Sequence, residues 1–221
     1  MIGLSERLAA GLNLFAHESN VQYYRFRTRI RDGKHRFHPD ILLIHIPKCA
    51  GVSLRDALNA EVLPHKLFCD FADERVSRAR RIALCTRDPF DRAVSMYHYL
   101  ERISREHPLV HAAMGLPRAS DFTRFVQSRA FEQLEAHNYF FRSQFAYVKG
   151  VERYAEKAVA LRFEHLAEDF KTHFGRDIPR LNATRRDDET GFDTPENRDR
   201  VRSVYRADYD LLPILLSELR G

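Results

Sequence analysis

Tryptophan is absent from this 221-residue chain, and its only cysteines are Cys49, Cys69 and Cys85. An odd number of cysteines without a CxxC pair argues against a disulfide scaffold and against a zinc site, so no metal and a reducing, cytoplasmic location are expected. No apolar run approaches the roughly 20 residues that a membrane-spanning helix needs. The first residues include Glu6 and Arg7 and no continuous apolar stretch, which argues against a secretory signal.

A large charge imbalance is also missing, because 36 lysine and arginine residues oppose 31 aspartate and glutamate residues, for a net charge of +5. Apolar residues make up 44% of the chain, close to the globular average of about 45–50%, which excludes an intrinsically disordered protein. A small basic surplus indicates either solubility or an anion-binding site. Arginines and tyrosines gather at 23–36, but no nucleic-acid-binding motif accompanies them, so no nucleic acid is expected as a partner.

Three short apolar runs predict buried β-strands at residues 41–46, 80–86 and 157–164. Helical periodicity follows each run, and further helices are predicted over 119–148 and 195–220. Alternating strands and helices predict a three-layer α/β/α fold with a central parallel sheet. No linker or composition break divides the chain after residue 40. We therefore expect one domain over 41–221, preceded by a helical and basic N-terminal appendage over 1–40.

The turn after the first predicted strand has the composition of an anion site, and its sequence is Pro47-Lys48-Cys49-Ala50-Gly51-Val52-Ser53-Leu54. Backbone N–H groups at the start of the following helix attract anions, while Lys48 adds a positive charge and Ser53 a hydroxyl. Ala50 and Gly51 are small enough for a ligand to approach the backbone. The order differs from the GxxxxGK[ST] loop, which argues against a nucleotide kinase. The alternative is an ordinary strand–helix turn with a surface lysine.

A second candidate anion site follows the second predicted strand. Arg87 ends the strand, Asp88 is placed to cap the next helix, and Asp88, Arg92 and Ser95 share one helix face. An arginine fork with a hydroxyl suits a phosphate, although a surface Arg–Asp pair and a solvent-facing serine are the alternative. Adjacent parallel strands would bring both turns to one sheet edge. A nucleotide with phosphates on its 3′ and 5′ sides needs that arrangement.

The segments IHIPKCAGVSL and RDPFDRAVSMYHYL together resemble the sulfotransferases that use 3′-phosphoadenosine 5′-phosphosulfate, above all the carbohydrate branch with the Golgi chondroitin and heparan 2-O enzymes and bacterial relatives. The resemblance, which extends over residues 41–212, implies a P-loop-like fold and sulfuryl transfer to a saccharide hydroxyl. It assigns the 3′-phosphate to Arg87 and Ser95. It assigns the 5′-phosphosulfate to Lys48, Cys49, Ala50, Gly51, Val52, Ser53 and Leu54. Val52 departs from the family's usual threonine, which removes one hydroxyl.

The resemblance also implies two catalytic groups. Lys48 would neutralise charge on the oxygen that bridges to the leaving phosphate. A base must take the proton of the acceptor hydroxyl, and the candidates between the two turns are Glu61, His65, Asp70 and Asp73. His65 is predicted, because PHKLFCDF is similar to the family's histidine segment and imidazole is neutral near pH 7. The alternative for His65 is an exposed loop histidine.

Downstream, HNYFFRSQFAYV resembles the family's segment with His and Arg-Pro-Gln, so Arg142 and Gln144 are predicted to contact the acceptor or the nucleotide. Arg185 and Arg186 follow a loop similar to the family's Leu-Asn-x-Thr element, and they are predicted to add to the 3′-phosphate site. A solvated run of charges is the alternative for these two arginines. The expected partner is a saccharide, with an acidic glycan among the candidates. A relative that binds the nucleotide without catalysing transfer is the first alternative function, and a basic nucleic-acid-binding protein that uses the arginines and tyrosines of 23–36 is the second.

Overall fold

A computed structural model describes residues 40–60, 65–108, 111, 121–178 and 191–219. The chain forms a parallel three-stranded sheet in the order β1 (Ile41–Ile44), β2 (Arg81–Thr86) and β3 (Ala158–Arg162). In its register Leu43 lies opposite Ala83, which lies opposite Val159. The predicted α/β class and parallel sheet are therefore confirmed. The third strand is shorter than predicted, because the chain turns into a 3-10 helix, η3, at Phe163–His165.

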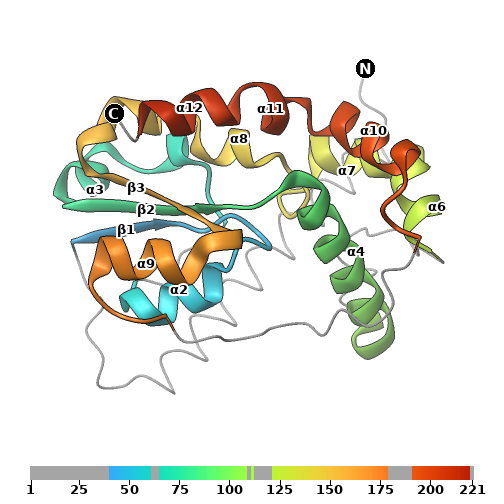
Figure 1. Ribbon diagram of the computed structural model, residues 1–221, viewed down its shortest axis with the longest axis horizontal. Coiled ribbons are helices and arrows are strands. Elements are labelled where there is room, and N and C mark those ends of the chain that lie inside the picture. The colour runs from blue at the N-terminus through green and yellow to red at the C-terminus, as the bar shows by residue number, and fades with distance from the viewer. Residues whose placement is uncertain (1–39, 61–64, 109–110, 112–120, 179–190, 220–221) are drawn as a thin grey trace.

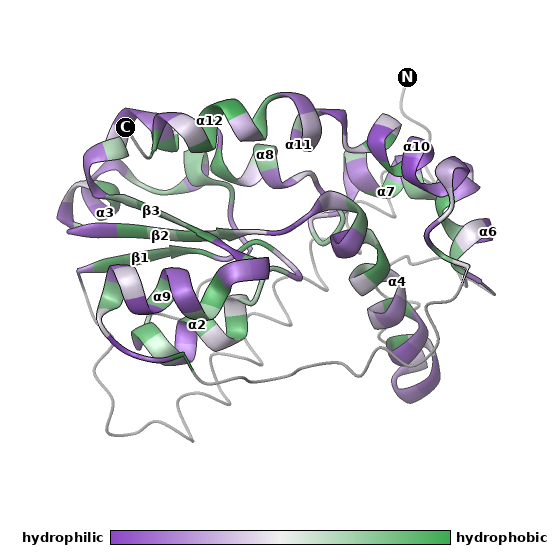
Figure 2. Ribbon diagram, viewed as in Figure 1, coloured by the Kyte–Doolittle hydropathy of each residue, from purple (hydrophilic) through white to green (hydrophobic). Residues whose placement is uncertain are grey.

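Helices lie on both sides of the sheet, as Figure 1 shows. On one side are α2 (Gly51–Leu58) and α9 (Leu166–Phe174), and on the other are α8 (Gln144–Val148), α11 (Arg206–Asp210) and α12 (Leu212–Glu218). The whole of β1 and all of β2 after its first residue are buried. Coverage from both sides explains why these strands are continuous apolar runs rather than alternating ones (Figure 2).

A second group of helices packs beside the sheet around the aromatic side chains of Phe122, Phe125 and Phe131. It comprises α4 (Pro89–Glu106), α6 (Phe122–Gln127), α7 (Arg129–His137) and α10 (Pro195–Val204). The single helical segment predicted over 119–148 is divided in the structure. Ser128 caps α7 with its side chain, and the chain leaves helical geometry again between α7 and α8.

Shorter elements complete the described part of the chain: η1 (Phe68–Asp70), α3 (Asp73–Arg78) and η2 (Val151–Lys157). The C-terminal helical region predicted as one or two helices contains α10, α11 and α12. The predicted N-terminal appendage lies outside the described residues, apart from Asp40. None of the helices in the described ranges combines the length and the apolarity that crossing a membrane requires.

Candidate functional site

The turn between β1 and α2 holds Lys48 in an unusual backbone conformation. Lys48 has φ 67° and Ala50 has φ 57°, so two residues with a Cβ occupy the left-handed region. Such conformations are costly for residues other than glycine and concentrate at binding sites. The N–H of Leu54 donates to the carbonyl of Ala50 at 3.0 Å, which starts α2 immediately after the turn. The predicted strand–turn–helix around Lys48 is thus present.

Gly51 has no left-handed φ, and its small size is required by a neighbouring histidine ring instead. A Cβ at Gly51 would lie 1.8 Å from Cδ2 of His45 and 2.1 Å from its Nε2. His45 follows β1 and packs over the first turn of α2. Burial, followed by the charges of His65 and Arg55, holds the pKa of His45 well below its usual value. The ring is therefore neutral.

His65 packs against His45 at this edge of the sheet. The two ring centroids are 4.2 Å apart, and the His65 ring stacks on Tyr139 at 5.6 Å. Nδ1 of His65 lies 2.8 Å from the carbonyl oxygen of His45. A carbonyl only accepts hydrogen bonds, so Nδ1 of His65 carries a proton. In the uncharged form of the ring, Nε2 is then the basic nitrogen.

The other predicted candidates for the base are not held in this way. The family-like segment after His65 contains η1 and no strand, and Asp70 is exposed within it. Asp73 is exposed at the start of α3, and Glu61 lies outside the described residues. His65 is thus the member of this set that the structure holds next to the β1–α2 turn.

Lys48 is surrounded by other cations. Its Nζ lies 5.3 Å from the ring centroid of Tyr99, and the Arg102 guanidinium lies 5.6 Å from the same centroid. Burial, followed by the charges of Arg102 and Arg87, lowers the pKa of Lys48 to about 8. Positive charges gathered around a half-buried amine create a local potential that favours an anion.

The turn after β2 meets the Lys48 turn directly. Nη1 of Arg87 lies 3.5 Å from the backbone oxygen of Lys48, and the Arg87 guanidinium packs 4.2 Å from the ring centroid of Phe163. Asp88 caps α4, because its Oδ1 accepts from the N–H of Asp91 at 2.9 Å. The expectation that β1 and β2 are neighbours, with both turns at one edge, is confirmed.

Ser95 lies on the face of α4 that is turned toward the Lys48 turn. Three residues earlier, Arg92 donates from Nε to the carbonyl of Pro47 at 3.0 Å. Four residues later, Tyr99 lies beneath the Lys48 amine. Since both neighbours on this face contact the β1–α2 turn, Ser95 lies on the side of α4 that faces this turn. Its contact with a phosphate stays a prediction.

Arg92 also contributes to the site. The sequence placed it on the helix face of Asp88 and Ser95 but assigned it no role. It is fully buried, and besides Pro47 its guanidinium bonds to backbone oxygens of the chain between α7 and α8. Nη2 lies 2.9 Å from the oxygen of Arg142 and 3.4 Å from that of Phe140. Contacts of a helical arginine with distant carbonyls leave no pattern in the sequence.

The side chain of Gln144 is not placed to contact an acceptor. Its side chain is completely buried, and its amide bonds to the backbone of Arg87. Contact with an acceptor would require these bonds to break. Arg142 is half-buried near the same segment, and Arg185 and Arg186 lie outside the described residues.

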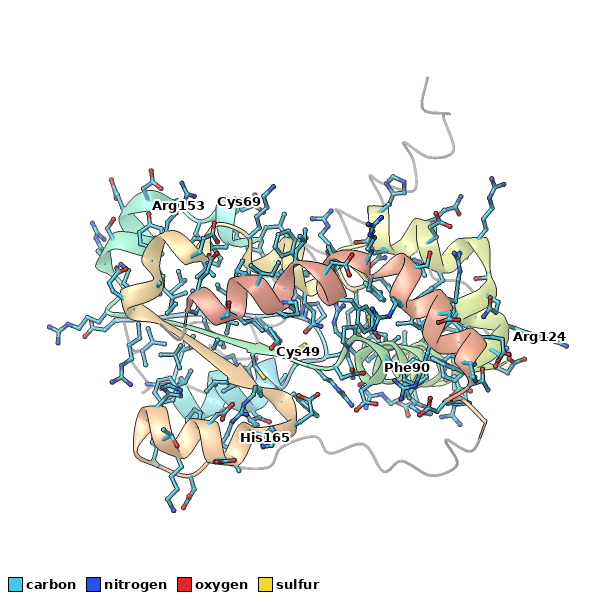
Figure 3. The ribbon with its side chains drawn as sticks, turned by 45° about the horizontal axis from the view of Figure 1, so that its top comes forward. Cys49, Cys69, Phe90, Arg124, Arg153 and His165 are labelled. Carbon is cyan, nitrogen blue, oxygen red and sulfur yellow. The ribbon has the colours of Figure 1, made fainter. Side chains whose placement is uncertain are left out.

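The first-turn residues differ in their exposure. Cys49 lies between the sheet and the helices beside it (Figure 3), and burial raises the pKa of its thiol to about 12. Ser53 and Leu54 are buried, whereas Val52 is 37% exposed. An uncharged thiol and an exposed valine leave the backbone, Lys48 and Ser53 as the polar groups of this turn.

A cavity of about 600 Å³ is lined by Arg87, by Glu164 and by residues of α11 and α12. Asp88, Glu164 and Asp208 contribute three carboxyl groups to its lining against the single cation of Arg87, so its net charge does not suit a phosphate. In the described ranges, no group of three or more His, Cys, Asp or Glu residues is arranged to hold a metal ion. Comparisons of the chain with protein-family models, with curated proteins and with solved structures found no match.

Proposed function

We propose that this chain is a sulfotransferase with a P-loop-like fold that moves a sulfuryl group from 3′-phosphoadenosine 5′-phosphosulfate to a saccharide hydroxyl. One observation carries the proposal: two basic turns meet at the carboxyl ends of adjacent parallel strands, with Arg87 3.5 Å from the backbone of Lys48. Ligands of open parallel sheets bind at this edge. A nucleotide with phosphates on two sides matches two adjoining turns.

The charges around Lys48 fit such a donor. Arg87 and Arg102 lower the pKa of Lys48 after burial, and a bound anion would relieve the repulsion among the three side chains. Lys48, Ser53 and the backbone N–H groups in the first turn of α2, at residues 51–53, would hold the phosphosulfate. Arg87 and Ser95 would hold the 3′-phosphate, to which Arg185 or Arg186 would add. The donor supplies the sulfuryl group and leaves as adenosine 3′,5′-bisphosphate.

Two side chains are assigned to the chemistry. The ammonium of Lys48 neutralises negative charge that develops next to it, which is typically the largest contribution to catalysis of group transfer. His65 accepts the proton of the acceptor hydroxyl at Nε2, while its Nδ1–H is held by the His45 carbonyl. In the uncharged tautomer that donates from Nδ1, Nε2 is the nitrogen that would take the proton.

Two measurements test this function. Incubation with the ³⁵S-labelled donor and a mixture of neutral and acidic oligosaccharides should label a saccharide, and omission of the chain should abolish the label. Calorimetry should show that adenosine 3′,5′-bisphosphate binds more tightly than AMP, because only the former engages both turns. Equal affinities for the two nucleotides would contradict the 3′-phosphate site.

A nucleotide-binding relative without transferase activity is the second candidate, and Val52 favours it. The side chain is exposed at the turn where the family has threonine, so this turn offers one hydroxyl fewer. Under this alternative the bisphosphate binds, no acceptor is labelled, and Val52→Thr produces labelling that the unchanged chain lacks. Labelling by the unchanged chain excludes it.

A further inference from the structure

The side-chain amide of Gln144 bridges the two basic turns from inside the molecule. Its Oε1 accepts from the N–H of Arg87 at 2.9 Å, and its Nε2 donates to the carbonyl of Arg87 at 2.8 Å. The same Oε1 lies 3.3 Å from Sγ of Cys49, which donates to it. One amide therefore holds the backbone of one turn and a side chain of the other.

Gln144 is itself fixed from the opposite side. Its backbone N–H donates to Oδ2 of Asp208 at 3.0 Å, and the N–H of Phe145 donates to Oδ1 at 2.8 Å. Gln144 is fully buried and Asp208 is 3% exposed. A carboxylate that accepts two N–H groups at the start of α8 leaves the glutamine with little freedom to move. Buried and fully bonded networks of this kind hold one geometry.

We propose that Gln144 is a positioning residue that sets the separation of the Lys48 and Arg87 turns, and thereby the preference of the site for nucleotides with two separated phosphates. The inference rests on the proposed donor site. It gives Gln144 a role in donor recognition without contact with the donor or the acceptor.

The physical consequence concerns selectivity more than affinity. A ligand that engages both turns binds best when their separation is already set, because no free energy is then spent on ordering them. A ligand with one phosphate engages one turn and is indifferent to the separation. Loss of the bridge therefore weakens binding of the bisphosphate more than binding of the monophosphate.

The test compares adenosine 3′,5′-bisphosphate and AMP as calorimetric ligands of the full chain and of Gln144→Met, which keeps the side-chain volume and removes the amide. We expect the ratio of the two affinities to fall about tenfold, the equivalent of one or two net hydrogen bonds. General destabilisation would weaken both ligands alike and leave the ratio unchanged.

Asn197→Leu is the matched control, because Asn197 is also fully buried and its amide donates to Thr123 and to the carbonyl of Phe192 in the other helix group. We expect this variant to lose stability and to keep the ratio. A Gln144→Met ratio equal to that of the unchanged chain would overturn the positioning role. A similar fall in Asn197→Leu would overturn it too.

The experiment also distinguishes failure of the proposed function from failure of the Gln144→Met variant to fold. If the unchanged chain binds both nucleotides equally, the proposed function fails before any variant is made. If circular dichroism shows that Gln144→Met does not fold, Cys49→Ala decides, because it removes the thiol bond to the same amide, together with a weaker contact of the thiol with the Pro47 carbonyl. We expect Cys49→Ala to lower the ratio about threefold, as loss of one weak hydrogen bond should, and an unchanged ratio would refute the bridge.

Discussion

At the scale of single residues, Lys48 combines a left-handed backbone conformation with an amine whose charged form is disfavoured by its surroundings. Burial and two nearby arginines lower its pKa to about 8, whereas the same amine in an unfolded chain titrates near 10.5. The folded state therefore binds this proton more weakly than the unfolded state does. Its unfavourable contribution to folding is present below pH 8 and disappears as the pH rises toward 10.5.

This pKa predicts a pH dependence of ligand binding. Below pH 8 the Lys48 amine is charged and attracts a phosphate, so affinity for adenosine 3′,5′-bisphosphate should fall as the pH rises through about 8. Lys48→Arg keeps its charge throughout this range and should remove most of the fall. Calorimetric titrations between pH 6.5 and about 9.5 check the prediction, and parallel pH profiles for the two proteins would contradict it.

Lys48→Ala tests the catalytic assignment at the same scale. Removing a group that stabilises developing charge typically lowers the rate about 10²–10³-fold, so sulfuryl transfer should fall by that factor. The free energy of unfolding should not decrease, because a buried cation among other cations is removed. Initial rates at saturating donor, with a urea denaturation curve as the control, measure both. Transfer at the original rate would show that the mechanism is wrong.

At the scale of elements, Gly51 and His45 show how β1 and α2 are fitted together. Gly51→Ala would place a methyl group within 1.8 Å of the His45 ring, so either the ring or the start of α2 must move. Overpacking of this kind typically costs about 1–3 kcal/mol. His45→Ala in the same chain should relieve the clash. We expect the double variant to be more stable than the sum of the two single effects predicts, as measured by urea denaturation.

The packing of Gly51 against His45 can also be tested through its effect on His65. If Gly51→Ala displaces the His45 ring, it also disturbs the carbonyl that holds Nδ1 of His65. Transfer by Gly51→Ala should then fall while its affinity for the bisphosphate changes less. An equal loss of both would instead indicate that Gly51 acts on the phosphate site.

Local signals in the sequence were sufficient for much of this architecture. The apolar runs located the strands, and Asp88 before Pro89 located the start of α4, since a cap and a first-turn proline act within a few residues. Non-local contacts were not predictable. The amide of Gln144 is 57 residues from its partner Arg87, and nothing in the spacing distinguishes a buried bridge from a ligand contact.

At the scale of the whole molecule, Arg92 connects the sheet to the second helix group. Its helix, α4, contributes Ala93 and Met96 to that group, while its guanidinium bonds to Pro47 in the turn after β1. The same side chain also bonds to the segment before α8. One buried cation therefore ties the helix group both to the turn after β1 and to the segment before α8.

Arg92→Met removes that connection while keeping an unbranched side chain. Three backbone carbonyls that now accept from the guanidinium would lose that donor, and the free energy of unfolding should fall by about 3 kcal/mol or more. Arg206→Met is the control, because Arg206 is 83% exposed and pairs with Asp210 on the surface. Its effect should stay below about 1 kcal/mol. Comparable urea midpoints for both variants would contradict the role of Arg92.

The strand order β1-β2-β3 limits where further strands could be added to this sheet without separating the two basic turns. Neighbouring strands are about 4.8 Å apart, so direct pairing of β1 with β2 brings the Lys48 and Arg87 turns close enough for the Gln144 amide to bridge them. A strand inserted between them would roughly double that interval and separate the two cations. Strands added beyond β1 or β3 would leave the interval intact, so growth of the sheet at its margins is the route of enlargement that keeps the two basic turns together, as the proposed nucleotide site requires.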